Sequence, residues 1–192
     1  MQQEKIIQEA ISFIRALFDG NSDGHDFEHS MRVYRTAMVL AESEPGCDRL
    51  VVSLAALLHD ADDPKLFHTE NNANARKFLD SQGIEQSTAE AVCLAVNSVS
   101  FSKNQGKRPE TLEAMIVQDA DRLDAMGAVG IARTFAYGGK HGRPLESSIQ
   151  HFSDKLLRLK DMMNTDLAGK MAEDRHLFMM NFLDEWVQET GE

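Results

Sequence analysis

The run from Val51 to Leu58 is almost wholly apolar, and it ends directly in the pair His59-Asp60. An apolar run of this length without strand-like alternation predicts a buried helix. Histidine and aspartate at a buried helix end cost desolvation energy unless both are paired, and a divalent cation is one of the few partners that can pair with both. The run therefore predicts a helix with a metal site at its end, although a chain with seven histidines also produces such a dipeptide by chance.

The composition is typical of a globular protein with one hydrophobic core. The chain has 192 residues, of which 42% are hydrophobic and 27% charged, and this fits a single domain spanning residues 1–192. No apolar run approaches the roughly 20 residues that a membrane span needs, and the first residues lack the pattern of a signal peptide. We therefore expect a cytoplasmic protein in which Cys47 and Cys93 are reduced thiols.

The formal net charge of −11 limits the partners. Affinity for nucleic acid comes mainly from clustered Lys and Arg, so we expect neither a nucleic acid polymer nor a membrane as a partner. A small phosphorylated ligand is compatible with the charge, because one metal ion and a few local cations are enough to neutralise it.

Apolar residues recur at helical spacing along the chain, and no stretch alternates with the period of a strand. The expected fold is all-α, a compact array of about eight helices. Asp26 and Asp48 are expected to cap the helices that carry His29 and the apolar run. Pro109 is expected to start the helix that contains residues 119–124.

Two further helix boundaries follow from local signals. Ser87 with Glu90 has the pattern of a capping box, which predicts a helix over Ala91 to Val99. Gly138-Gly139 is expected to end a short helix. The loop that leads from these glycines to Pro144 is a candidate to close over a bound ligand.

Three segments place metal-ligating residues in a recognisable order. A histidine comes first, the pair His59-Asp60 (the HD pair) follows at the end of the apolar run, and an aspartate within residues 119–124 comes last. This order on an all-α chain resembles the HD-domain metal-dependent phosphohydrolase superfamily. The segments that carry the resemblance are Glu28-His29-Ser30-Met31-Arg32-Val33, Ala55-Ala56-Leu57-Leu58-His59-Asp60 and Ala120-Asp121-Arg122-Leu123-Asp124-Ala125.

Later segments resemble a small bacterial subfamily of that superfamily, so the resemblance covers nearly the whole chain. This subfamily includes members with nucleoside triphosphate pyrophosphohydrolase activity supported by manganese, and the resemblance implies the same activity here. The segments are Gln118 to Ala125, Gly130 to Gly139, His151-Phe152, Lys155 to Leu157, Lys160 to Thr165 and Ala172 to His176.

The metal ligands that the resemblance implies are His29, His59, Asp60 and Asp121. Two imidazoles and two carboxylates leave open positions on an octahedral ion, which favours Mn²⁺ and also suits Mg²⁺, Co²⁺, Ni²⁺ or Fe²⁺. Family members that hold two metals usually have additional histidines before the last aspartate, whereas only His68 lies in that interval here. We therefore expect one divalent metal.

Residues near these ligands have other interpretations. His25 lies four residues before the first histidine ligand, but it is better explained as a turn residue. Asp119 and Asp124 are expected to belong to a solvated acidic face. Asp63 follows the HD pair by three residues, where a number of HD nucleotidases carry an acidic residue that orients the attacking water, and it is our candidate catalytic residue. An N-cap of the next helix explains Asp63 equally well.

The resemblance implies a nucleoside triphosphate substrate, deoxy or damaged, that is cleaved between the α and β phosphates to a monophosphate and pyrophosphate. An acidic protein must neutralise the leaving pyrophosphate locally. Arg and Lys on helices are usually solvated or paired with an acid, so we expect only some of the candidate cations to contact phosphate. The candidate phosphate-binding residues are Lys65, Arg122, Arg133, His151 and Lys155.

Other functions fit the same motifs. A 5'-nucleotidase or a phosphodiesterase acting on a small nucleotide would use the same ligands. A non-catalytic HD module that binds a nucleotide and regulates a partner would bind without turnover, and a metal-free helical scaffold would leave the HD pair unexplained. A homodimer is also compatible with the sequence, because helical periodicity does not tell an interface from core.

Overall fold

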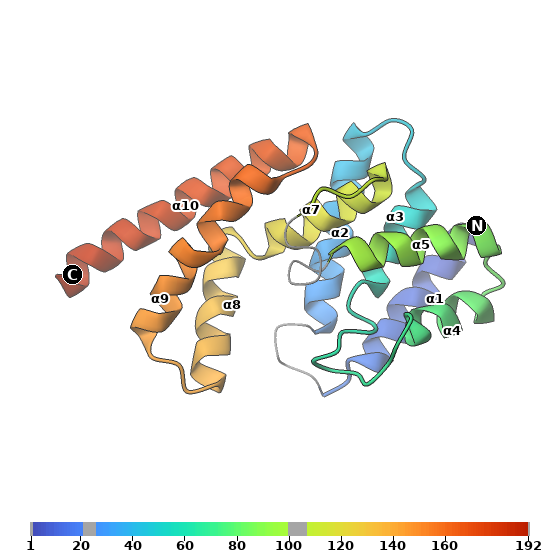
Figure 1. Cartoon of the computed structure of the whole chain (residues 1–192), viewed down its shortest axis with the longest axis horizontal. Coiled ribbons are helices and arrows are strands. Elements are labelled where there is room, and N and C mark those ends of the chain that lie inside the picture. The colour runs from blue at the N-terminus through green and yellow to red at the C-terminus, as the bar shows by residue number, and fades with distance from the viewer. Residues whose placement is uncertain (1, 21–25, 100–106, 192) are drawn as a thin grey trace. The chain divides into compact units, whose positions relative to one another are not determined.

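The structure, a computed structural model, describes residues 2–20, 26–99 and 107–191, and it confirms the predicted all-α fold (Figure 1). Every regular element within these ranges is helical. In this part of the chain, no helix has the length and apolar character to cross a membrane. The elements are α1 (Gln2–Leu17), α2 (Phe27–Ser43), α3 (Arg49–Leu58), α4 (Ala73–Ser81), α5 (Gln86–Val99), α7 (Leu112–Asp124), α8 (Gly127–Lys140), α9 (Leu145–Asp154), the 3-10 helix η1 (Leu156–Met162) and α10 (Asp166–Thr190).

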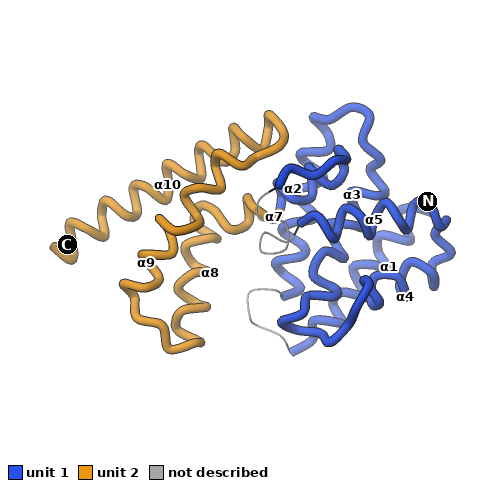
Figure 2. The backbone as a smooth tube through the Cα atoms, in the orientation of Figure 1, with its two compact units in different colours: residues 1–120 blue, residues 121–192 orange. Residues whose placement is uncertain are grey.

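The chain divides into two compact units, residues 1–120 and residues 121–192 (Figure 2). Helices α1 to α5 belong to the first unit, and α8 to α10 with η1 belong to the second. Helix α7 begins in the first unit and ends in the second. The sequence predicts one domain over residues 1–192, which stays a prediction, and the structure shows these two compact units.

The core of the first unit is built around α3. Its residues from Val51 to Leu58 are all buried, with exposed fractions between 0 and 4%, and α3 packs against α1, α2 and α5. Phe13 of α1 stacks on Phe78 of α4 with 5.0 Å between the ring centroids, so α4 is also anchored to the core. The apolar run is therefore the central buried helix that its sequence predicted.

Carboxylate caps fix the starts of α2 and α3, as predicted. The side chain of Asp26 accepts a hydrogen bond from the backbone N–H of His29 at 2.8 Å. The side chain of Asp48 accepts from the N–H groups of Leu50 and Val51 at 2.9 and 3.2 Å. An N-cap carboxylate satisfies backbone donors that the first helical turn leaves unpaired. These caps fix where the helices that carry His29 and the apolar run begin.

Two predicted helix starts are wrong. Helix α5 begins at Gln86, so Ser87 lies inside the helix, and Glu90 accepts a hydrogen bond from the Gln86 side chain at 3.0 Å instead of closing a capping box. Helix α7 begins at Leu112 and not at Pro109. The hydroxyl of Thr111 accepts the N–H of Ala114 at 3.3 Å, because a threonine oxygen can satisfy a first-turn donor and a proline ring has no such acceptor.

In the second unit, Gly138 serves close packing and does not end a helix. Helix α8 continues through Gly138 and Gly139 to Lys140. A Cβ at Gly138 would lie 2.5 Å from the hydroxyl oxygen of Ser148 on α9, so the missing side chain lets α8 approach α9. The loop predicted from Gly138 to Pro144 is therefore shorter, and only residues 141–144 connect the two helices.

We predict that Gly130→Ala and Gly139→Ala change the stability in opposite directions, although both glycines lie in α8. A Cβ at Gly130 would lie 2.3 Å from the carbonyl oxygen of Ala125, whereas a Cβ at Gly139 would meet no atom within 4 Å. Overpacking against backbone costs about 1–3 kcal/mol, and replacing an unhindered helical glycine with alanine stabilises by about 0.5–1 kcal/mol. Urea unfolding monitored by circular dichroism measures both changes, and equal effects would contradict the packing of Gly130.

Candidate metal centre

Three side chains of the kinds that can bind a metal meet where α2 begins and α3 ends. The Nε2 atoms of His29 and His59 lie 3.1 Å apart. The Oδ2 atom of Asp60 lies 3.4 Å from the His29 nitrogen and 3.2 Å from the His59 nitrogen. His29 is in the first turn of α2, and His59 is the C-cap of α3. These three atoms therefore form a compact triangle within the first unit.

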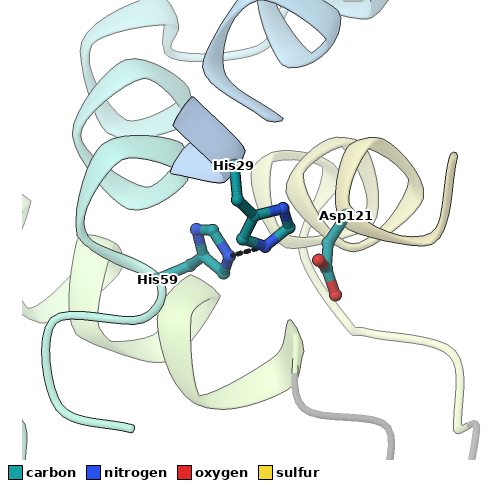
Figure 3. A group of neighbouring side chains, drawn as sticks. All are labelled: His29, His59 and Asp121. Carbon is teal, nitrogen blue, oxygen red and sulfur yellow. Dashed lines mark hydrogen bonds between the residues drawn. The ribbon is translucent and has the colours of Figure 1, made fainter. Parts of the chain in front are cut away.

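A backbone contact fixes the protonation of the His59 ring. Its Nδ1 lies 2.8 Å from the carbonyl oxygen of Ala56. A carbonyl can only accept a hydrogen bond, so Nδ1 must carry the proton. In the neutral ring the lone pair is then on Nε2, which is the atom that points toward His29 (Figure 3). This is the arrangement that a histidine needs to bind a metal through Nε2.

The two histidine rings meet edge to face, with centroids 5.0 Å apart and an interplanar angle of 73°. Each ring therefore offers one nitrogen to the same point from a different direction. The exposed fractions of His29, His59 and Asp60 are 0, 8 and 7%. Such burial of three polar side chains is costly unless they are paired with one another or with a cation.

Asp121 is the fourth predicted ligand and lies on α7. One ligand atom each of His29, His59 and Asp121 falls within 4.8 Å of the other two, as expected for three ligands of one ion (Figure 3). Earlier residues of α7 anchor the helix in the first unit. Glu113 accepts the backbone N–H of Asp48 at 2.9 Å, and Gln118 donates to the carbonyl of Ser98 at 2.8 Å.

The distances fit one divalent ion. Ligands about 2.1 Å from a metal and at right angles to one another are about 3.0 Å apart, close to the 3.1 and 3.2 Å separations around His59. The donor set of imidazole nitrogens and carboxylate oxygens contains no thiolate, which suits a six-coordinate ion with open positions better than a closed structural zinc site. The His29, His59 and Asp121 cluster could thus hold a metal, and the full four-residue ligand set stays a prediction.

The acidic residues beside Asp121 were expected to be solvated, and this expectation is wrong. Asp119 and Asp124 have exposed fractions of 0 and 4%. Asp124 forms an ion pair with Arg133 of α8, with 2.5 Å between Oδ2 and Nη1. The pairing depends on Arg133, which lies nine residues later on α8, and the local sequence of α7 contains no signal for it.

Asp63 does not cap the next helix, so that alternative is wrong. Its Oδ1 accepts the backbone N–H of Lys65 at 2.8 Å, in a turn far ahead of the start of α4 at Ala73. The carboxylate that reaches α4 belongs to Asp62, which accepts the N–H groups of Asn74 and Ala75. Sequence reasoning missed Asp62, because its partners lie 12 and 13 residues away. His25 lies outside the described residues.

The five candidate phosphate-binding residues have different surroundings. Lys65 is exposed, whereas Arg122 is buried and donates to the carbonyl oxygen of Met162. Arg133 pairs with Asp124, as described above. His151 and Lys155 are half-buried on and just after α9. Their roles stay predictions, and Arg122 and Arg133 also bind partners within the protein.

Burial lowers the pKa of His151, and the nearby charges of Lys155 and Arg143 lower it further. A histidine with a lowered pKa is neutral at pH 7, because the unperturbed value is already about 6.5. A neutral His151 would contact a phosphate through a hydrogen bond and not through a positive charge. A bound anion would favour the protonated ring and so raise the pKa again.

We predict that Mn²⁺ raises the melting temperature of the wild-type chain and not that of His59→Ala. A ligand at 100 times its dissociation constant stabilises the folded state by about 2.7 kcal/mol, which corresponds to a shift of roughly 5–10 °C for a chain of this size. Thermal unfolding with Mn²⁺ and with EDTA measures the shift. His141→Ala is the matched control, because His141 is exposed and lies on the second unit. An equal shift in His59→Ala would contradict the site.

Comparisons with known proteins agree with this geometry. A model of the HD domain family matches residues 26–126, a range that contains His29, His59, Asp60 and Asp121. The chain is 40% identical to the uncharacterized protein YpgQ of Bacillus subtilis, over 95% of this chain and 93% of YpgQ.

Solved structures are similar over almost the full length. The crystal structure of YpgQ in complex with ADP has a TM-score of 0.85 and 35% identity, and the match covers 98% of this chain and 97% of YpgQ. An HD-superfamily hydrolase from Bacillus thuringiensis has a TM-score of 0.81 and 37% identity, with coverage of 100% of this chain and 99% of that protein. The chain therefore belongs to the HD domain family, and it is a hydrolase of the HD superfamily.

Proposed function

We propose that this chain hydrolyses nucleoside triphosphates, deoxy or damaged, between the α and β phosphates, with one divalent metal ion, for which Mn²⁺ is favoured. The observation that carries the proposal is the buried triangle of His29, His59 and Asp60, whose ligand atoms lie within 3.4 Å of one another. Metal-dependent hydrolysis needs such a site with open coordination positions. We propose that residues 1–192 act as one functional domain.

The nucleotide part of the proposal is supported by YpgQ. That relative was crystallised in complex with ADP, and it matches this chain over nearly its whole length. A nucleoside diphosphate moiety is also the part of a nucleoside triphosphate that contains the α–β bond. The choice of that bond rests on the resemblance of the segments from Gln118 to Gly139 to the pyrophosphohydrolase subfamily.

The residues that would hold the metal are His29, His59, Asp60 and Asp121. When bound there, a divalent ion polarises a phosphate oxygen and lowers the pKa of a nearby water. The protein contributes rigid ligands, because the backbone N–H of His29 is held by the Asp26 cap of α2 and the ring of His59 is held by the carbonyl of Ala56.

Asp63 is our candidate for the group that handles the proton. Its hydrogen bond from the N–H of Lys65 fixes one carboxylate oxygen in the turn that follows Asp60. In the proposed reaction the water oxygen bonds to the α-phosphorus, the proton passes to Asp63, and the bond from the α-phosphorus to the bridging oxygen breaks. The pyrophosphate leaves with that oxygen, and the nucleoside monophosphate retains the oxygen from water.

Positive charge for the leaving group would come from the exposed Lys65, and from His151 and Lys155 on the second unit. A bound polyphosphate would raise the lowered pKa of His151 toward its usual value, because opposite charge favours the protonated ring. Arg122 and Arg133 would contribute in addition to their contacts with Met162 and Asp124.

We expect the purified chain with Mn²⁺ to convert nucleoside triphosphates to monophosphate and pyrophosphate. In ¹⁸O-enriched water, the label should appear in the monophosphate, because the attack is at the α-phosphorus. Chromatography with mass spectrometry identifies both products. Asp63→Asn should keep its metal affinity and lose about 10²–10⁴-fold in kcat, the usual contribution of a general base.

Other products would select other functions. A nucleoside diphosphate with single phosphate, or a nucleoside with tripolyphosphate, would keep the hydrolase and overturn the proposed bond. Tight nucleotide binding without any turnover would overturn the enzyme and favour a regulatory HD module.

A further inference from the structure

The turn that follows His59 and Asp60 is clamped to the start of α4. The two carboxylate oxygens of Asp62 accept the backbone N–H groups of Asn74 and Ala75 at 2.9 and 3.0 Å. In the opposite direction, the side-chain amide of Asn74 donates to the carbonyl oxygen of Ala61 at 2.8 Å. Asp62 and Asn74 thus form three hydrogen bonds between segments that are 12 to 13 residues apart. We call these three hydrogen bonds the clamp.

Helix α4 needs this carboxylate, because it has no cap of its own. The residue at its N-cap position, Asn72, adopts a left-handed conformation with φ of 57° and makes no side-chain capping bond. The first N–H groups of a helix have no partner within the helix, and the positive end of the helix dipole attracts a carboxylate. Asp62 accepts the hydrogen bonds of these N–H groups and also places a negative charge at the start of the helix, although it lies 12 to 13 residues earlier in the chain.

The other end of the clamp is rigid. Ala75, Phe78 and Leu79 of α4 have exposed fractions of 4% or less, and the Phe78 ring stacks on Phe13 of α1. Hydrogen bonds to the first turn of α4 therefore connect the turn after Asp60 to the core of the first unit.

The turn after Asp60 depends on its hydrogen bonds to α4. Helix α3 ends at Leu58, so Asp60 lies beyond the regular helical hydrogen bonds. Within the turn, the N–H of Ala61 donates to the carbonyl of Leu58, and the N–H of Asp63 donates to the carbonyl of Asp60. These local bonds define a tight turn, and the clamp on its second half fixes the direction in which the turn leaves α3.

We propose that Asp62 is a positioning residue of the metal centre, acting with Asn74 to hold the turn that carries Asp60. Asp62 does not touch the metal or the substrate. It keeps the Asp60 carboxylate 3.2 Å from the His59 nitrogen and 3.4 Å from the His29 nitrogen. This role rests on the proposed metal site, and it leaves the substrate and the cleaved bond open.

The test compares Asp62→Ala and Asn74→Ala with Asp48→Ala in the full chain. Asp48 is a matched control, because its carboxylate caps the opposite end of α3 through two N–H groups. Isothermal titration calorimetry with Mn²⁺ measures affinity, and thermal unfolding without metal measures the loss of stability. Residues that hold metal ligands in place typically change affinity by about 10–100-fold. We expect a loss of about tenfold in Asp62→Ala, a smaller loss in Asn74→Ala and less than twofold in Asp48→Ala.

Asp62→Asn keeps one acceptor oxygen and the side-chain shape, so its Mn²⁺ affinity should lie between those of wild type and Asp62→Ala. This variant and Asn74→Ala keep the inference testable if Asp62→Ala does not fold. Affinities in Asp62→Ala and Asp62→Asn equal to that of Asp48→Ala would overturn the positioning role and leave the proposed function intact.

A wild-type chain that binds Mn²⁺ but hydrolyses no nucleotide would overturn the proposed function, while the measured affinities would still decide the role of Asp62. A wild-type chain that binds no divalent cation would overturn the metal site and the positioning role together.

Discussion

The nitrogen atoms of two histidines and a carboxylate oxygen are held within 3.4 Å of one another in a buried corner of the first unit. Close burial of such groups is unfavourable without a partner that satisfies them together. The neighbouring helices hold these three side chains in place. Helix α3 is buried from Val51 to Leu58 and ends at His59, while the cap at Asp26 holds the backbone of His29 on α2.

The turn after α3 contains three aspartates that look alike in sequence and have different partners in the structure. Asp60 lies against the two imidazoles, Asp62 binds the N–H groups that start α4, and Asp63 accepts an N–H within its own turn. An acidic stretch of this kind is easily interpreted as a solvated surface. Its contacts instead assign one carboxylate to the candidate metal centre, one to its support and one to the turn beside it.

Features that depend on neighbours along the chain were predictable, and those that depend on distant packing were not. The caps at Asp26 and Asp48 involve the next few residues, and the buried α3 follows from an uninterrupted apolar run. The role of Asp62 and the burial of Asp124 depend on partners in other helices. For the candidate site, the order of the motifs indicated His29, His59, Asp60 and Asp121. The structure places the two histidines close to Asp60 and close to Asp121, and the four-residue ligand set stays a prediction.

The central claim is that these four side chains surround one divalent ion. X-ray absorption spectroscopy of the Mn²⁺-loaded chain tests it directly, because imidazole rings give a characteristic multiple-scattering signal. We predict a first shell of six nitrogen and oxygen atoms at about 2.1–2.2 Å, with the signal of two imidazoles that falls to one in His29→Ala. A spectrum without imidazole scattering, or one that is unchanged in His29→Ala, would contradict the account.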